Sequence, residues 1–199
     1  MGNNLTVFVM FGPQGSGKST QVERLASKLN LKVFEAGEAL RTRSQIDENI
    51  HLQLKQGILV ADETMREIIE EFISDNTTKT GYVFDGYPRN VNQFEGFMSL
   101  VTKYHWEVVG IFINLSDESA KKRLSTRFQI IDGQKVFRED DKPEIVQNRL
   151  DTFKRETLPL KAKFLEVYNL LEIDGEPPVD TVTSEISEAV DRFLNDANK

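Results

Sequence analysis

The chain has 199 residues, no cysteine, 39% hydrophobic and 29% charged residues, and a formal net charge of −7. This length suits one hydrophobic core with small insertions, and the lack of cysteine excludes disulfides and thiolate metal sites and fits a reducing, cytoplasmic location. The acidic balance argues against a broad nucleic-acid surface, so we expect no nucleic-acid partner. No apolar run approaches the roughly 20 residues that span a bilayer, so we expect no membrane partner either.

The first feature in chain order is an expected strand, a glycine-rich loop and a helix. Residues 5–11 form an apolar run of buried-strand length, and apolar residues recur at helical spacing over 22–29. Between them, residues 12–19 match G-x-x-x-x-G-K-S/T, the pattern of the phosphate-binding loop. A glycine turn with a surface lysine is the alternative, but a loop between strand and helix favours phosphate binding.

Each part of this loop has a chemical role. The glycines let backbone N–H groups close around phosphate oxygens, because no Cβ is in the way. The helix start adds a partial positive charge at the same place. Lys18 brings a full charge to the β- and γ-phosphates, and a hydroxyl from Ser19 or Thr20 can meet Mg²⁺.

The next stretch alternates polar and apolar segments. Residues 32–35 are a second short strand, 37–56 are polar and helical in pattern, and 57–60 form a short apolar connection. Asp62 is expected to cap the following helix. That helix carries apolar residues on one face: Met65, Ile68, Ile69 and Phe72.

A third strand is expected to end in a carboxylate. The apolar residues before Asp85 deliver it to the strand's carboxyl end, and a Gly/Pro turn follows. In open α/β sheets ligands bind at this edge, so we expect Asp85 beside the phosphate loop, where it can order water on Mg²⁺. A helix is expected over about 90–103.

Residues 108–115 form the most continuous apolar run and are expected to be a central parallel strand. Ser116 caps the next helix, on which Arg123 and Arg127 share a face because they are four residues apart. Taken singly, each arginine could instead pair with acidic residues on its own helix surface.

The segment 128–137 breaks the helical pattern and carries a D-G turn between short apolar pieces, which predicts a hairpin. It has no Cys or His, which excludes a zinc-clamped flap. A capping box at Asp141 and Glu144 opens a helix that runs to about residue 169.

A last strand at 170–173, a loop at 174–178 and a final apolar-striped helix complete the chain. Strand–helix alternation with parallel strands predicts a three-layer α/β domain. We expect a single domain with a core of 1–35, 61–124 and 141–199, and insertions near 36–60 and 125–140.

These motifs resemble the nucleoside monophosphate kinase family, and most of all its adenylate kinase members. The resemblance covers nearly the whole chain, and the ordered set of motifs is far more specific than any one of them. The matches are G-P-Q-G-S-G-K-S-T at 12–20, G-E-A-L-R at 37–41, G-I-L-V at 57–60, D-G-Y-P-R at 85–89, Gln93, R-L-S-T-R at 123–127, R-E-D-D at 138–141, Arg149 and I-D-G at 173–175.

The resemblance implies a P-loop fold with a five-stranded parallel sheet, an insertion that binds the nucleoside monophosphate, and a short lid. It implies that ATP is bound by Gly12, Gly15, Ser16, Gly17, Lys18, Ser19, Thr20, Arg123, Arg127 and Pro177. It implies that AMP is bound by Ala36, Arg41, Ile58, Leu59, Val60, Gly86, Arg89, Gln93, Arg138 and Arg149. The implied catalytic residues are Lys18, Arg89, Arg127, Arg138 and Arg149.

The implied activity is reversible, Mg²⁺-dependent phosphoryl transfer from ATP to AMP by a monomer. Such transfer asks a protein mainly for positioning and charge stabilisation, and arginine offers a planar fork that matches phosphate oxygens. Several arginines on an acidic protein are therefore consistent with two nucleotides in one site. Mg²⁺ is expected to be held through phosphates and water near Ser19 and Asp85, without direct protein ligands.

Some positions depart from the adenylate kinase pattern. Adenylate kinases usually carry Thr where this chain has Ala36, whereas UMP/CMP kinases resemble the chain there and at Asn90. Those enzymes usually carry Asn where this chain has Gln93, whose amide can give a donor and an acceptor to the adenine edge. Glu38 stands where Asp is usual. We favour AMP as acceptor, with UMP/CMP or another nucleoside monophosphate kinase as the alternative.

A non-catalytic P-loop module is a more remote alternative. A GTPase should show an N-K-x-D guanine-binding pattern, and the nearest candidate, at 114–117, lacks the lysine. A degenerate kinase should have lost Lys18 or several arginines, and this chain keeps them.

Overall fold

The computed structural model describes residues 5–56, 60–131, 134–137 and 142–197. In these residues five parallel strands form one sheet in the order β2-β3-β1-β4-β7. The strands are β1 Thr6–Phe11, β2 Lys32–Glu35, β3 Tyr82–Asp85, β4 Glu107–Asn114 and β7 Asn169–Asp174. The predicted three-layer α/β fold with a five-stranded parallel sheet is confirmed.

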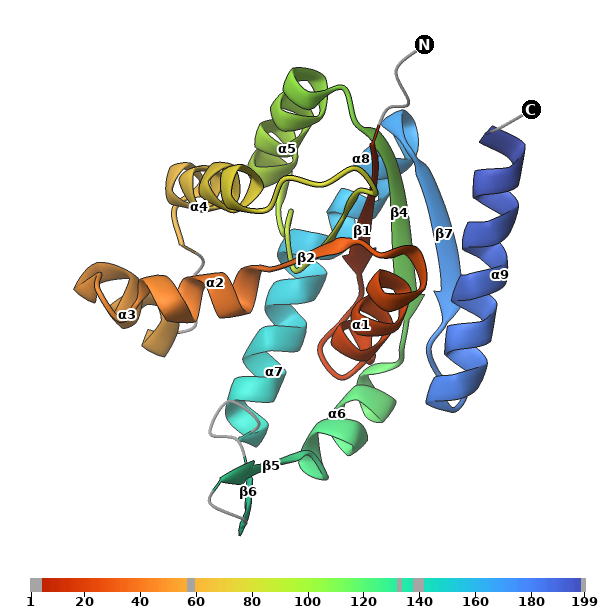
Figure 1. The fold of residues 1–199 in the computed structure, drawn as a ribbon. Coiled ribbons are helices and arrows are strands. Elements are labelled where there is room, and N and C mark those ends of the chain that lie inside the picture. The colour runs from red at the N-terminus through yellow and green to blue at the C-terminus, as the bar shows by residue number, and fades with distance from the viewer. Residues whose placement is uncertain (1–4, 57–59, 132–133, 138–141, 198–199) are drawn as a thin grey trace.

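Helices cover both faces of this sheet (Figure 1). One face carries α1 Lys18–Leu29 and α9 Val179–Ala197, and the other carries α4 Asp62–Asp75, α5 Val91–Tyr104 and α8 Leu158–Val167. Side chains alternate along a strand, so Val7 and Val9 of β1 pack toward α4 and α5 while Phe8 and Met10 pack toward α1 and α9. Because both faces are covered, β1 reads as a continuous apolar run.

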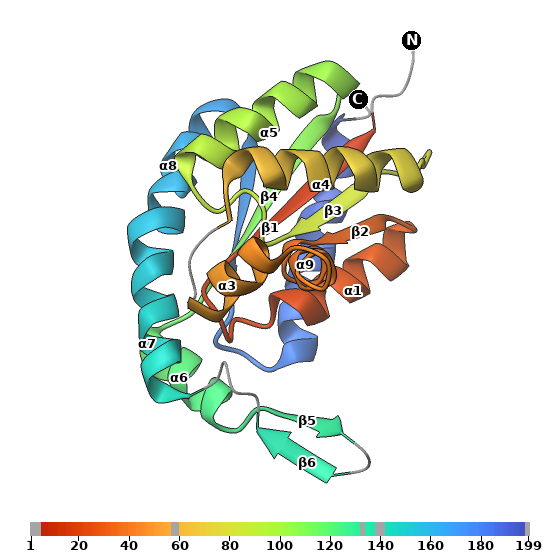
Figure 2. The ribbon, with the colours of Figure 1, turned by 90° about the vertical axis from the view of Figure 1, so that its left-hand side faces the viewer.

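Two insertions project from this core, the first seen best in Figure 1 and the second in Figure 2. The first holds α2 Ala36–Arg43 and α3 Glu48–Gln56. The second follows α6 Asp117–Ser125 and is the antiparallel pair β5 Phe128–Ile131 and β6 Gln134–Phe137, which confirms the predicted hairpin. Its D-G turn lies outside the described residues.

The polar stretch predicted as helical over 37–56 is two helices. Asp47 separates them, since its Oδ1 accepts hydrogen bonds from the backbone N–H groups of Asn49 and Ile50, at 3.0 and 3.1 Å. A carboxylate that meets the free N–H groups of a first turn starts a new helix.

Two other boundaries differ from the predictions. Asp62 is the first residue of α4 and the capping position is Ala61, so the predicted cap was wrong. The predicted helix to residue 169 is α7 Pro143–Thr152, a π-helical turn at Phe153–Thr157, and α8. Pro159 offers no N–H to the helical ladder, which accounts for an irregular turn just before it.

The N-cap of α7 is Lys142 and not the predicted Asp141. Asp141 itself lies outside the described residues. Within the described residues, no helix combines the length and the apolar character needed to cross a membrane.

Candidate active site

The candidate site lies at the carboxyl edge of the central strands. The phosphate loop follows β1 directly, and Asp85 ends the neighbouring strand β3 in register with Met10. The predicted place of Asp85 beside the loop is therefore confirmed. This edge is where open α/β sheets bind ligands.

The loop needs glycine at two positions for space. A Cβ on Gly12 would lie 2.7 Å from the carbonyl oxygen of Ile113, and a Cβ on Gly15 would lie 3.0 Å from that of Ala120. Both residues also have positive φ, 147° and 84°. The loop thus packs closely on the end of β4 and on α6, with a backbone conformation that glycine adopts readily.

Lys18 folds back over this loop. Its Nζ donates to the carbonyl oxygens of Gly12 and Pro13, at 2.7 and 2.9 Å. Burial lowers the pKa of Lys18 to about 8; the Asp85 charge opposes this, and three nearby arginines add to it. These arginines are Arg89, Arg149 and Arg127. An ammonium that is buried and surrounded by like charges is stabilised by an anion.

Ser16 adds a polar group inside the loop. Its hydroxyl is buried, and within the described part of the chain it has no hydrogen-bond partner. Buried polar groups in proteins are nearly always paired, so an unpartnered one at a phosphate loop indicates a place for a ligand oxygen.

Ser19 and Asp85 join the helix α1 to β3. The Ser19 hydroxyl donates to Oδ2 of Asp85 at 2.9 Å. Hydroxyl and carboxylate oxygens suit Mg²⁺, a hard cation that usually keeps several waters. Among the residues described, no group of three or more His, Cys, Asp and Glu side chains could hold a metal. Thr20, one residue further, is exposed.

Arg89 is held in a tight turn by its own backbone and side chain. Its Nε donates to the carbonyl of Gly86 at 2.7 Å, and its backbone N–H donates to Oε1 of Gln93 at 2.8 Å. Burial lowers the pKa of Arg89, and the charge of Arg149 lowers it further. Like charges that lower one another's pKa are stabilised by a nearby anion.

Gln93 and Asn90 have structural roles in the same turn. The Asn90 side chain caps α5 by accepting from the Gln93 backbone N–H at 2.8 Å. Gln93 is buried, and the hydrogen bond recorded for its side chain uses the oxygen, so its NH₂ group is the part that can meet a base. The N-cap accounts for Asn90 without reference to the acceptor.

The insertion formed by α2 and α3 contributes Arg41 to the candidate site. Arg41 lines an open depression of about 620 Å³ between α2 and α3. Ala36 and Val60 are buried at the base of this insertion, and Ile58 and Leu59 lie outside the described residues, as does Arg138.

Glu35 was missed by the sequence analysis. It ends β2 in register with Asp85, and its pKa is raised by burial and then by the charges of Asp85, Glu38 and Glu23. The signal was its place at a strand end, next to the strand that carries Asp85.

A second end of the site is built around residues 175–178. Nη2 of Arg123 donates to the carbonyls of Gly175 and Glu176, at 2.7 and 3.0 Å. Arg123 thus contacts the loop that holds Pro177, while Asp117, an acidic residue on the same helix, pairs with Lys154. Pro177, half-buried, is in the same loop.

The Glu176 side chain ties this loop to α6. Hydrogen bonds from the Ser119 hydroxyl and the Ser116 backbone lower the pKa of Glu176 to about 2. Ser116 caps α6 as predicted, accepting from the Ser119 backbone N–H at 3.2 Å.

A model of the family described as adenylate kinase matches residues 10–169 of the chain. The chain belongs to the adenylate kinase family.

The chain is similar to curated adenylate kinases of diverse organisms. It is 30% identical to the adenylate kinase of Rickettsia bellii (strain RML369-C) over 211 residues, which cover 92% of this chain and 98% of that protein. It is 30% identical to that of Agrobacterium fabrum over 196 residues, covering 96% and 98%. It is 28% identical to that of Methanococcoides burtonii over 211 residues, covering 93% and 98%.

As a member of the adenylate kinase family, the chain brings together residues that are far apart in sequence. The pKa of Lys18 is lowered by the charges of Arg89, Arg127 and Arg149, and that of Arg89 by the charge of Arg149. Asp85 accepts a hydrogen bond from Ser19. Gln21, which the sequence analysis passed over, is buried and contacts the start of α9. Its signal was a polar residue within the apolar face of α1.

Proposed function

We propose that this protein is a phosphotransferase that moves a phosphoryl group reversibly from ATP to AMP, giving two ADP. The observation that carries the proposal is the convergence of Lys18, Arg89, Arg127 and Arg149 at the glycine loop. Four cations that gather at one site of an acidic protein suit the combined charge of two nucleotides. Membership of the adenylate kinase family supports the same choice.

In this proposal the loop holds the phosphates of ATP. Gly12, Gly15 and Gly17 leave room for backbone N–H groups around the oxygens, and Ser16 supplies its buried hydroxyl. Lys18 exchanges the loop carbonyls for the β- and γ-phosphates. Thr20 lies one residue after Ser19 on the first turn of α1.

The base end and the acceptor end take the remaining roles. Arg123 and Pro177 flank the ATP adenine, and Gln93 reads the adenine of AMP. The AMP phosphate and the group in flight are held by Arg41, Arg89, Arg127, Arg138 and Arg149. The backbone around Ala36, Ile58, Leu59, Val60 and Gly86 lines the acceptor.

Mg²⁺ would be held through the phosphates of ATP and through water, near the Ser19 hydroxyl and the Asp85 carboxylate. Bound there, it would neutralise charge on the phosphates of ATP. The protein's own groups orient the two nucleotides, and an ionised phosphate oxygen of AMP needs no protein base to attack.

We propose further that α2 and α3 form the acceptor-binding insertion and that the β5–β6 hairpin is the lid, which would exclude water as a competing acceptor. We propose that the protein acts as a monomer in the cytoplasm. The lack of cysteine supports a reducing compartment.

UMP/CMP kinase activity is the second candidate, and Ala36 favours it. A coupled spectrophotometric assay with ATP and Mg²⁺ should compare AMP, UMP, CMP, GMP and dTMP as acceptors. We expect AMP to give the highest kcat/KM. Turnover of UMP or CMP with none of AMP would replace the proposed acceptor, and no turnover of any would support a binding module.

A further inference from the structure

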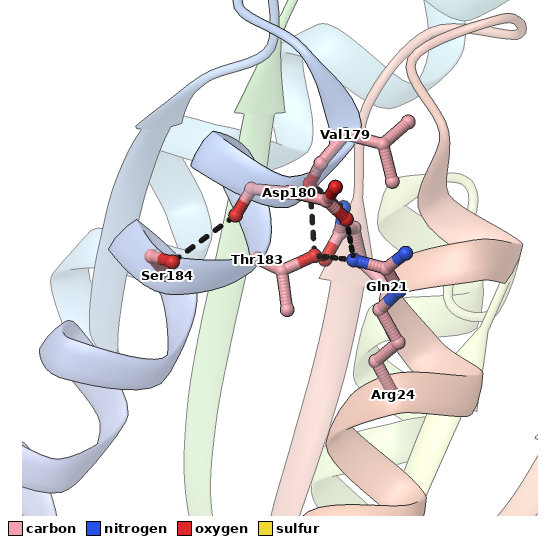
Figure 3. Close-up of polar contacts among 6 residues, drawn as sticks. All are labelled: Gln21, Arg24, Val179, Asp180, Thr183 and Ser184. Carbon is pink, nitrogen blue, oxygen red and sulfur yellow. Dashed lines mark hydrogen bonds and ion pairs between the residues drawn. The ribbon is translucent and has the colours of Figure 1, made fainter.

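A polar seam joins the first turn of α1 to the start of α9 (Figure 3). Nε2 of Gln21 donates to the carbonyl oxygen of Val179 at 3.2 Å. The Thr183 hydroxyl lies 2.9 Å from Oε1 of Gln21 and 2.8 Å from the same Val179 carbonyl. Arg24 adds two further contacts, since its Nη1 donates to the Thr183 hydroxyl at 2.6 Å and to Oδ1 of Asp180 at 2.7 Å.

Gln21 is placed to connect two parts of the donor site. It is 3% exposed, and it sits three residues after Lys18 on the same helix. Its partner Val179 is the first residue of α9 and lies two residues after Pro177. One side chain therefore links the phosphate loop's helix to the end of the 175–178 loop, across 158 residues of sequence.

The same loop is held on its other side by α6. Arg123 binds the carbonyls of Gly175 and Glu176, and the Glu176 carboxylate accepts from the backbone N–H of Ser116 at 2.9 Å. The loop is thus tied to α6 at its beginning and to α1 at its end. Its distance from the phosphate loop is set by the α1 contact, because Gln21 belongs to the helix that the phosphate loop opens.

Simple helix packing is the competing explanation for the seam. The surface contacts serve that purpose: Lys28 pairs with Asp191, and both side chains are over one-third exposed. Gln21 differs from these because it is buried and its partner is a backbone carbonyl at the loop's end. A buried amide that holds a backbone carbonyl controls where that backbone lies.

We propose that Gln21 and Thr183 are positioning residues that set the distance between the phosphate loop and the 175–178 loop. Through this distance they determine the affinity for the base of the nucleoside triphosphate. The inference rests on the proposed function only in taking 175–178 as the base end of the donor site. Neither side chain touches the substrate; both act through the loop.

The test separates the base end from the phosphate end by calorimetry. The variant Thr183→Val keeps the shape and loses the hydroxyl, and Thr183→Ser restores it. With Mg²⁺ present, we expect Thr183→Val to weaken ATP binding roughly three- to tenfold, because the variant loses the hydrogen bond that the hydroxyl donates and the one that it accepts from Arg24. Binding of inorganic tripolyphosphate, which has no base, should be unchanged.

The controls make the outcome decisive. Thr183→Ser should bind ATP within twofold of the parent, and Lys28→Ala, which removes only exposed contacts with Ser187 and Asp191, should match it. In turnover, Thr183→Val should raise the KM for ATP while leaving the KM for AMP unchanged. Gln21→Leu, measured in the same way, provides a second probe if the threonine variant fails to fold.

Equal weakening of ATP and tripolyphosphate would overturn the proposal, since it would mean that the seam only supports α1. Unchanged ATP binding in both variants would also overturn it. Because the calorimetry needs no acceptor, a protein that binds ATP as expected but does not phosphorylate AMP would refute the proposed function and leave this inference standing.

Discussion

The phosphate end and the base end of the proposed ATP site are built in different ways. The phosphate end comes from eight consecutive residues, 12–19, whose glycines and lysine are neighbours in the chain. The base end is assembled from residues 52 to 158 positions apart, through Arg123 with Gly175 and Gln21 with Val179. A loop that must present its own backbone N–H groups can be encoded locally, whereas a loop that must sit at a set distance needs partners from elsewhere.

The two ends also differ in electrostatic state. Lys18 is buried among arginines with its pKa lowered to about 8, so the phosphate end gains stability when an anion arrives. At the base end the hydrogen bonds from Ser119 and Ser116 instead stabilise the charged form of Glu176 and lower its pKa to about 2, and Arg123 donates to two carbonyls. We therefore expect damage at the phosphate end to reduce the reaction rate and damage at the base end to reduce affinity.

The largest expected effect is that of Lys18→Met. Loss of one preorganised charge from the transition state should lower kcat by about a hundredfold to a thousandfold. Steady-state assay with ATP and AMP measures this, and far-UV circular dichroism checks the fold. Lys28→Met, on the same helix but exposed, is the matched control and should keep the parent rate. A parent-like rate for Lys18→Met would contradict the assigned role.

A smaller effect, of a different kind, is expected from Arg123→Ala. Two hydrogen bonds from a charged donor are lost, so the KM for ATP should rise by roughly tenfold or more, with kcat changed only a few-fold. The KM for AMP should stay constant, which steady-state kinetics with each nucleotide varied in turn can verify. Lys122→Ala, the neighbouring exposed cation on α6, is the control. A drop in kcat as large as that of Lys18→Met would remove the distinction between the two ends.

The smallest expected effect is the uptake of a fraction of a proton by Lys18 when ATP binds. Phosphates raise the pKa of Lys18, so ATP binding near pH 8, where that group is about half protonated, should take up about half a proton. Calorimetry at pH 8 in two buffers of different ionisation enthalpy measures it. Uptake should approach zero at pH 6.5, where the free protein already holds the proton, and affinity should fall above pH 8.

The same measurement sharpens the comparison of the two ends. Lys18→Met should abolish the uptake, whereas Arg123→Ala should leave it unchanged because its effect is at the other end. Proton uptake that persists without Lys18 would assign the titration to another group.

Much of the fold could be predicted because its signals are local. Apolar runs of strand length gave β1, β3 and β4, and the position of Asp85 at a strand end placed it beside the phosphate loop. The errors fell where a single local cue had two outcomes. Asp62 is a good capping residue, yet it became the first residue of its helix, with Ala61 before it.

The path from residue 143 to 169 shows the same limit. A capping-box pattern predicted one helix here, but the structure places a π-helical turn at Phe153–Thr157. Part of this turn is tied to the active-site side, because the Thr157 hydroxyl donates to the backbone carbonyl of Arg89 at 2.8 Å. A contact across 68 residues has no trace in the helical pattern.

The sequence by itself determined the phosphate loop, the parallel sheet and the set of cations, since glycine backbone freedom, side-chain periodicity and charge belong to the residues themselves. Only the tertiary structure decided that Gln21 reaches Val179 and that Glu35 stands beside Asp85. Such partners depend on how helices pack and which strands become neighbours, and these follow from the burial of both faces of the sheet as a whole.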